Sequence, residues 1–153
     1  MAAGDITFYN KWKKAQWDAG LTSTPVDLDT DTVSVAVMND TFSPDTGDSS
    51  AQVYWGDISA NQVATGAAYT GPIALATKTV TLSSGVAVFD ADNIVIAQDA
   101  TGFTNGRRLV IFKNTGTPST SPLLAVGDLG ANKSIVSGSL TFSWAATGIF
   151  RKT

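Results

Sequence analysis

The chain has 153 residues and a formal net charge of −3, and it contains neither Cys nor His. This length suffices for one domain with its own core, and the composition excludes a disulfide framework and a Cys-based metal site. The slight acidity also disfavours nucleic-acid binding, which needs a broad basic surface. All 13 acidic residues are Asp, which favours turns, whereas the missing Glu favours helices, so a protein of strands and turns is expected.

The N-terminal region predicts an amphipathic helix over residues 5–19, with Asp5 as its N-cap and Gly20 as its stop. Its apolar stripe repeats at helical spacing and consists of Phe8, Trp12, Ala15 and Ala19. Two interpretations are open: the helix packs on the chain's own sheet, or it is an aromatic arm that docks on a neighbouring subunit. We therefore divide the chain into a helix and linker, residues 1–24, and a single β-domain, residues 25–153.

The stretch Val26–Val37, VDLDTDTVSVAV, places Asp27, Asp29 and Asp31 at alternate positions. A calcium loop of the EF-hand type would need Gly at its sixth position and Glu at its twelfth, and both are missing here. The apolar positions change phase between Leu28 and Val33, which requires a turn or bulge near residues 29–32. The aspartates are thus predicted to form the polar entrance to a β-strand, and no metal site is expected.

The rest of the chain alternates short apolar runs with turn signals, which is typical of an all-β protein. The predicted strand segments are residues 33–37, 51–58, 73–82, 86–89, 93–97, 109–113, 123–126 and 139–144. A long polar loop, Asn39–Ser50, is expected to be mobile or ordered by a partner, and Phe42 is its one apolar residue. The predicted fold is an antiparallel β-sandwich, jelly-roll-like or immunoglobulin-like, preceded by the N-terminal helix.

Little in the sequence points to chemistry. Acid–base work would fall to Asp, Tyr or Lys, no pair of Asp stands out, and the motifs of phosphate-binding loops, dinucleotide sites and serine hydrolases do not occur. We expect no catalytic residue and no cofactor. Three aromatic residues in irregular segments, Tyr54, Trp55 and Tyr69, leave a carbohydrate-binding module open. Arg107 and Arg108 are read either as a strand entrance or as partners in a salt bridge to another protein.

No apolar run approaches the ~20 residues of a membrane span. The N-terminus also lacks a basic segment followed by an apolar one, so no signal peptide is expected. The sequence therefore predicts a protein that is made and folded in a cytosol.

Eight short segments carry a family resemblance, in a constant order along the chain. They are Phe8–Lys11, Val26–Thr32, Asn61–Val63, Ala68–Gly71, Val88–Asp92, Val110–Gly116, Ser121–Leu124 and Phe142–Arg151. The D-L-D-T-D-T entry to the valine strand and the terminal W-x-A-T-G-I-[LF]-R pattern are the most specific. Together they resemble a family of small structural proteins from the virions of tailed bacteriophages. Two surface stretches, residues 39–50 and 99–106, depart from the resemblance.

The resemblance implies a virion protein, assembled in the cytoplasm of the bacterial host, that decorates or cements the capsid. Its implied partners are the major capsid protein and further copies of itself, with no nucleic acid and no membrane. We expect the contacts with a partner to come from Phe8, Tyr9, Trp12 and Phe42. The alternatives are a tail, tail-tip or head–tail junction component, and a carbohydrate-binding module for host attachment.

Overall fold

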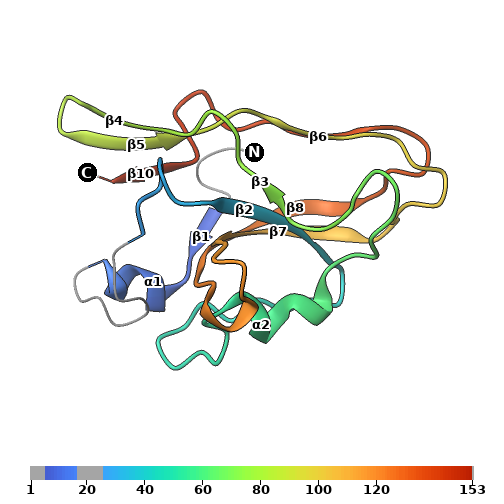
Figure 1. The fold of residues 1–153 in the computed structure, drawn as a ribbon, viewed down its shortest axis with the longest axis horizontal. Helices are drawn as coiled ribbons and strands as arrows, with labels where there is room; N and C mark the ends of the chain where they lie inside the picture. The colour runs from blue at the N-terminus through green and yellow to red at the C-terminus, as the bar shows by residue number, and fades with distance from the viewer. Residues whose placement is uncertain (1–5, 17–25, 153) are drawn as a thin grey trace.

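The computed structural model describes residues 6–16 and 26–152, which fold mostly into antiparallel β-sheets (Figure 1). The strands are β1 Ile6–Phe8, β2 Val33–Asn39, β3 Ile73–Ala74, β4 Thr79–Ser83, β5 Val86–Asp90, β6 Ile94–Ile96, β7 Gly106–Lys113, β8 Leu123–Lys133, β9 Leu140–Phe142 and β10 Phe150–Lys152. Two short α-helices, α1 Asn10–Ala15 and α2 Trp55–Ile58, and two single 3₁₀ turns, Ser59–Asn61 and Pro118–Thr120, join them. None of the helices in these residues is long and apolar enough to cross a membrane.

A five-stranded sheet of order β1-β8-β7-β2-β3 forms the centre of the molecule. Each of residues 33–38 of β2 is at most 1% exposed, so the side chains on both faces of this strand are buried. One face is covered near α2, where Trp55 stacks on Phe112 of β7. On the other face lie the remaining strands. The sheet is therefore covered on both sides, which explains why β2 lacks a polar face.

The other strands form a three-stranded sheet of order β10-β5-β4 and a two-stranded sheet of β6 and β9. Figure 1 shows β4, β5, β10 and β6 as a layer above the five-stranded sheet. Buried residues of this layer, such as Phe89, Ile96 and Phe150, belong to one core cluster with Val35 and Leu109 of the sheet below. The described residues thus share a single hydrophobic core.

The N-terminal element differs from the prediction. Residues 6–8 form a strand, because Ile6 and Phe8 pair with Gly127 and Ala125 of β8, and the helix covers only residues 10–15. Pairing with a distant strand thus decides the conformation of a segment whose local pattern also suits a helix. The predicted cap Asp5, the stop Gly20 and residues 17–19 of the predicted helix lie outside the described residues.

Three further predictions are wrong in detail. Residues 55–58 are helical rather than extended, and the predicted strand over 73–82 is broken between β3 and β4 at Thr77, which has φ 49°. The strand predicted over 123–126 is too short, since β8 continues to Lys133. The turn expected near residues 29–32 is confirmed at 28–30.

Candidate docking surface

Aromatic rings from four elements gather where α1 meets the upper layer. The ring centroid of Phe8 lies 5.1 Å from that of Trp12 and 4.9 Å from that of Phe150. The ring of Phe150 lies 5.5 Å from that of Phe89 on β5. Such aromatic pairs contribute roughly 0.5–1.5 kcal/mol each beyond the area they bury. The cluster ties β1 and α1 to β5 and to the C-terminal strand β10.

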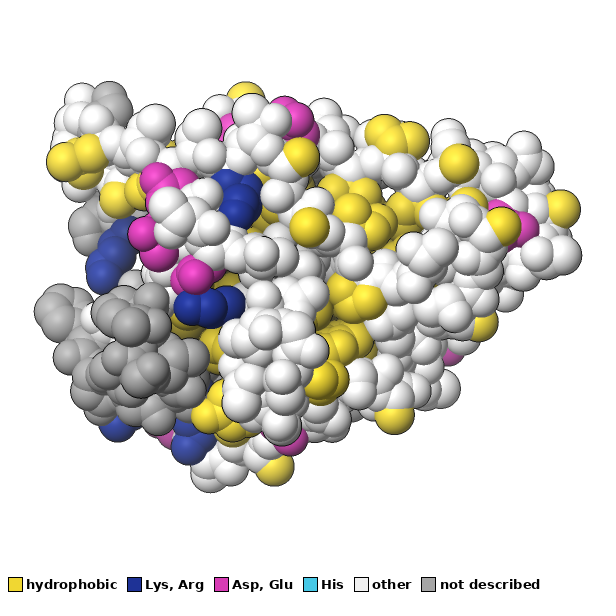
Figure 2. Space-filling model, in the orientation of Figure 1, with side chains coloured by type: hydrophobic (Ala, Val, Ile, Leu, Met, Phe, Trp, Pro, Cys, Tyr) yellow, Lys and Arg dark blue, Asp and Glu magenta, His cyan; other side chains and the backbone are white. Residues whose placement is uncertain are grey.

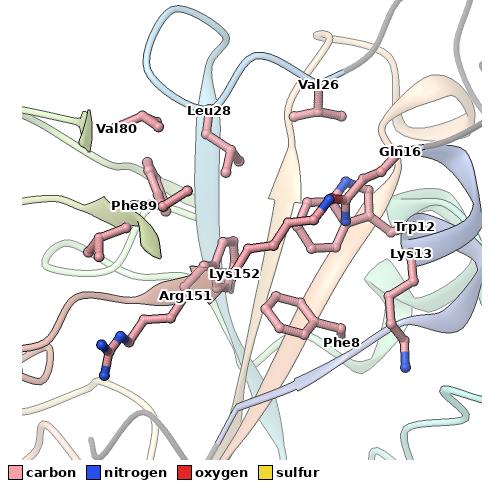
Figure 3. Close-up of a pocket in the computed structure, with 13 residues that line it drawn as sticks. Phe8, Trp12, Lys13, Gln16, Val26, Leu28, Val80, Phe89, Arg151 and Lys152 are labelled. Atoms are coloured by element: carbon pink, nitrogen blue, oxygen red, sulfur yellow. The ribbon is translucent and has the colours of Figure 1, made fainter. Parts of the chain in front are cut away.

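A pocket of about 390 Å³ opens beside this cluster (Figure 3). Its volume lies in the range of natural ligand pockets, about 300–1,000 Å³. Its walls come from β1, α1, the turn before β2, and the strands β4, β5 and β10. The larger apolar side chains of the lining are Phe8, Trp12, Val26, Leu28, Val80, Val88, Phe89 and Phe150.

Three cations, Lys13, Arg151 and Lys152, also line the pocket, and no carboxylate does so among the described residues. Figure 3 shows Lys13 and Arg151 on opposite sides, with their charged ends turned away from the centre. The Nζ of Lys152 donates to Oε1 of Gln16 at 3.3 Å. An apolar floor with a positive rim suits an apolar side chain presented by an acidic segment.

The predicted contact residues divide into two groups. Tyr9 and Phe42 are 1% and 2% exposed, so they lie in the chain's own core and offer a partner almost no surface. Phe8 is half-buried and Trp12 is 6% exposed, and both line the pocket. The aromatic side of α1 therefore packs on its own sheet. Contact of Phe8 and Trp12 with a partner stays a prediction.

Tyr9 carries an unusual polar atom, because its hydroxyl is buried without a hydrogen-bond partner among the described residues. Burial raises the pKa of Tyr9, and the negative charge of Asp45 raises it further. The hydroxyl therefore stays neutral.

The loop of residues 39–50 is tied to the rest of the chain instead of being free. Asn39 Oδ1 accepts hydrogen bonds from the backbone N–H groups of Thr41 and Phe42, at 3.1 and 3.0 Å. Asn10 Nδ2 donates to Asp48 Oδ1 at 2.7 Å, and Arg108 Nη1 donates to the Phe42 carbonyl at 2.6 Å. The loop is thus ordered by its own chain, which the sequence did not predict.

Both arginines at the start of β7 bind within the chain. Arg107 lies 3.1 Å and Arg108 3.8 Å from the carboxylate of Asp128 on β8. The backbone N–H of Gly130 donates to Asp128 and lowers its pKa, and the charge of Arg107 lowers it further. These arginines therefore cross-link β7 and β8, and a salt bridge from either of them to another protein stays a prediction.

The aspartates before β2 form a hydrogen-bonded turn. Asp31 Oδ2 accepts from the backbone N–H of Asp27 at 2.8 Å and pairs with Lys113 Nζ at 2.8 Å, while Lys78 Nζ donates to the Asp31 carbonyl. A hydrogen bond between the carboxyl groups of Asp27 and Asp29 lowers the pKa of Asp27 and raises that of Asp29. Within residues 6–16 and 26–152, no cluster of three acidic side chains is placed to hold a metal ion.

Two of the aromatic residues considered for sugar binding are buried. Trp55 stacks on Phe112 at 4.8 Å with an interplanar angle of 7°, and its exposure is 8%. Tyr69 is 1% exposed, its hydroxyl accepts the N–H of Val37 at 3.0 Å, and burial raises its pKa to about 12. These two rings pack in the core and present no face to a sugar, whereas Tyr54 is half-buried. The carbohydrate-binding module stays an untested alternative.

The pocket escaped the sequence analysis because its walls come from segments far apart in the chain. One signal could have revealed it. Four of the eight segments that carry the family resemblance meet there, namely Phe8–Lys11, Val26–Thr32, Val88–Asp92 and Phe142–Arg151.

No family model matches the chain, and neither a curated protein nor a solved structure is significantly similar to it. A function has to come from the residues and from the geometry above.

Proposed function

We propose that this chain is a structural protein of the virion of a tailed bacteriophage, and that it decorates or cements the capsid. In this role it acts as a homo-oligomer on the major capsid protein, without catalysis and without a cofactor. The observation that carries the proposal is the convergence of four resemblance segments on the apolar pocket.

Each of these segments contributes to the same surface. The first supplies Phe8, the second Val26 and Leu28, and the others add the residues Val88, Phe89, Phe150 and Arg151. The segments that resemble virion proteins thus line a hollow on the surface, and some of their residues also belong to the core beneath it. A hollow of this kind is what a structural protein needs to hold a neighbour, and it requires no acid–base residue.

The chemistry of the pocket defines the partner segment. One apolar side chain that moves from water into such a pocket contributes about 1.5–3 kcal/mol to binding. Exposed charge pairs with Lys13 and Arg151 add roughly 0–1 kcal/mol each, since water and salt screen them. A few kcal/mol per copy is modest. Over many copies on one shell, however, binding to the assembled state stabilises that state by mass action.

We further propose that the two layers form an antiparallel β-sandwich of the jelly-roll or immunoglobulin kind. Support comes from the placement of β4, β5, β10 and β6 over the five-stranded sheet and from the core that both layers share. An experimental structure in which these layers do not pack face to face would contradict this part of the proposal.

The location in the particle can be tested with an antibody against the purified chain and gold-labelled virions of the phage that encodes it. Label spread over the heads is the expected result. Label confined to the tail or its tip would overturn the capsid role and favour the tail alternative, and unlabelled particles that lack the protein altogether would overturn the virion role.

A further inference from the structure

Strand β4 is an open sheet edge of an unusual kind. Of the strands that lie at sheet edges in the described part of the chain, it is the longest, with five residues, whereas β1, β6, β9 and β10 have three and β3 has two. The opposite edge of the same sheet, β10, carries Arg151 and Lys152, but Thr79–Ser83 has neither a charge nor a proline. Proteins normally protect exposed edges with such residues, because an edge without them pairs readily with another strand.

The hairpin turn determines which backbone groups of β4 face outward. Ser84 and Gly85 join β4 to β5, and their φ values of 50° and 79° are those of a type I′ turn. Such a turn makes Ser83 and Val86 a hydrogen-bonded pair, and the pairs alternate along the ladder. The N–H and C=O groups of Val80 and Leu82 therefore point away from β5, toward the open side.

The side chains of the same two residues are also exposed. Val80 is 46% and Leu82 is 76% exposed, and they belong to the three large hydrophobic residues with high exposure in the described chain. They lie on one face of the hairpin, since each is paired with a residue of β5 on that face, Phe89 and Ala87. Figure 2 shows hydrophobic side chains at the surface where this hairpin ends.

We propose that β4 pairs with β4 of a second copy of this chain, in antiparallel orientation and with a two-fold axis at Thr81. In this register Val80 faces Leu82 of the other copy, and the outward N–H and C=O groups of both residues form four hydrogen bonds. Thr81 faces its own counterpart in a pair without hydrogen bonds, which is a favourable cross-strand pair. Two three-stranded sheets become one sheet of six strands.

The neighbouring registers are worse. Moving the axis to Leu82 would pair Val80 with Ser84, which lies in the turn at φ 50°. Moving it to Val80 would pair Leu82 with Lys78, which lies outside β4 and would bring a charge to each end of the pairing. Because the strand has no charge, two copies meet without like-charge repulsion.

The contact area sets the expected strength. A stable complex buries about 1,200–2,000 Å² in total, and one pair of five-residue strands buries well below that. The dimer should therefore be weak and concentration-dependent in solution. On a shared scaffold, where neighbouring copies reach local concentrations of order millimolar, the same contact would be occupied. The solution test below does not depend on where the protein is located in a virion.

Because the chain has no Cys, a single introduced thiol reports the register. In Thr81→Cys the two Cα atoms would lie about 4.5 Å apart, within the range of a disulfide, so mild oxidation of the full chain should give a covalent dimer. The matched control is Thr79→Cys, on the same strand and face. Its two copies would be separated by about 13 Å along the strands, too far for a bond. No dimer from a folded Thr81→Cys chain, or equal dimer from both variants, would overturn the proposal.

Sedimentation velocity over a range of concentrations tests the contact without a cross-link. Leu82→Lys should weaken dimerisation about tenfold or more while the thermal midpoint stays unchanged, because a lysine protects the edge. The control is Val95→Lys on β6, which replaces another exposed hydrophobic residue, 64% exposed, and should leave the dimer intact. A chain that stays monomeric at all concentrations, or a dimer that survives Leu82→Lys, would contradict the proposal.

Discussion

The five-stranded sheet and the three-stranded sheet contribute to one core, yet they differ in what they leave exposed. Residues 33–38 of β2 are at most 1% exposed, and both faces of that strand are covered. In the three-stranded sheet, Phe89 and Phe150 are buried, but Val80 and Leu82 on the same hairpin are largely exposed. Strand β2 therefore has no surface left for a partner, whereas the three-stranded sheet borders the pocket and ends in an open edge.

Because of this difference, one set of substitutions should test stability and another should test contacts with a partner. Substitutions at buried positions of the five-stranded sheet should destabilise the protein, so they cannot report on binding alone. Substitutions at the exposed hairpin and at the pocket rim should leave the fold intact and change only its contacts. Trp12→Ala illustrates the problem, since Trp12 is both buried and part of the pocket lining.

The largest effect is expected from Phe112→Ala in the covered sheet. Phe112 is 1% exposed and stacks on Trp55, so its removal should lower the free energy of unfolding by about 3–5 kcal/mol. Leu82→Ala on the exposed hairpin should change it by less than about 0.5 kcal/mol. Urea denaturation measures both, and similar losses in the two variants would remove the distinction between the sheets.

A smaller effect is expected from Gly148→Ala, just before β10. Gly148 has φ 91°, and a Cβ there would meet Val88 Cγ1 and lie 2.9 Å from the Phe89 carbonyl oxygen. Strain and crowding should together cost about 2–4 kcal/mol. Gly138→Ala is the control, because nothing lies within 4 Å of its Cβ position. Thermal midpoints that are equal for the two variants would show that β10 is not held as closely to β5 as the structure has it.

Low pH should remove the stability that Asp99 contributes to the loops it joins. Asp99 accepts hydrogen bonds from Thr101 and from the N–H groups of Ala67 and Ala68, which lower its pKa. A carboxyl whose pKa is lower in the folded state stabilises the fold above its unfolded pKa of about 3.9, and this contribution is lost as the pH falls through the folded value. The destabilisation by Asp99→Asn should therefore be clear at neutral pH and shrink in strong acid. A difference that is constant with pH would contradict this.

The smallest effect concerns the turn of the exposed hairpin. Ser84 adopts a left-handed conformation at φ 50°, where asparagine is more favourable. Ser84→Asn should stabilise the protein by about 0.5 kcal/mol, whereas Ser84→Ala should not. If calorimetry shows no gain for the asparagine variant, the turn is not of the type on which the β4 register depends.

The sequence predicts well the strands that alternation and burial specify locally. The valines of β2 and the apolar run of β7 are recognisable without knowledge of their neighbours, and the change of phase before Val33 locates the turn. Elements that depend on distant partners are missed. Ile6 and Phe8 form a strand only because β8 lies beside them. Strand β8 itself continues through Asp128, although aspartate favours turns, and Arg107 and Arg108 bind the carboxylate there.

The candidate site could be predicted only in part. Phe8 and Trp12 stand out in the sequence as aromatic residues, and both line the pocket. Tyr9 and Phe42 stand out equally, but they are buried, since aromatic content alone does not distinguish a core from a surface. The cations of the rim, Lys13 and Arg151, lie around one pocket only because the fold brings the two ends of the chain together, so the sequence does not reveal them as a pair.

The central claim is that the pocket holds a segment of the capsid. The most direct measurement is cosedimentation of the purified chain with capsid shells that lack it, using wild type, the double variant Lys13→Glu/Arg151→Glu, and Lys133→Glu at the far end of β8 as control. We expect wild type and the control to bind, and the double variant to lose binding while its thermal midpoint stays the same. Equal binding of all three, or no binding by the folded wild-type chain, would contradict the claim.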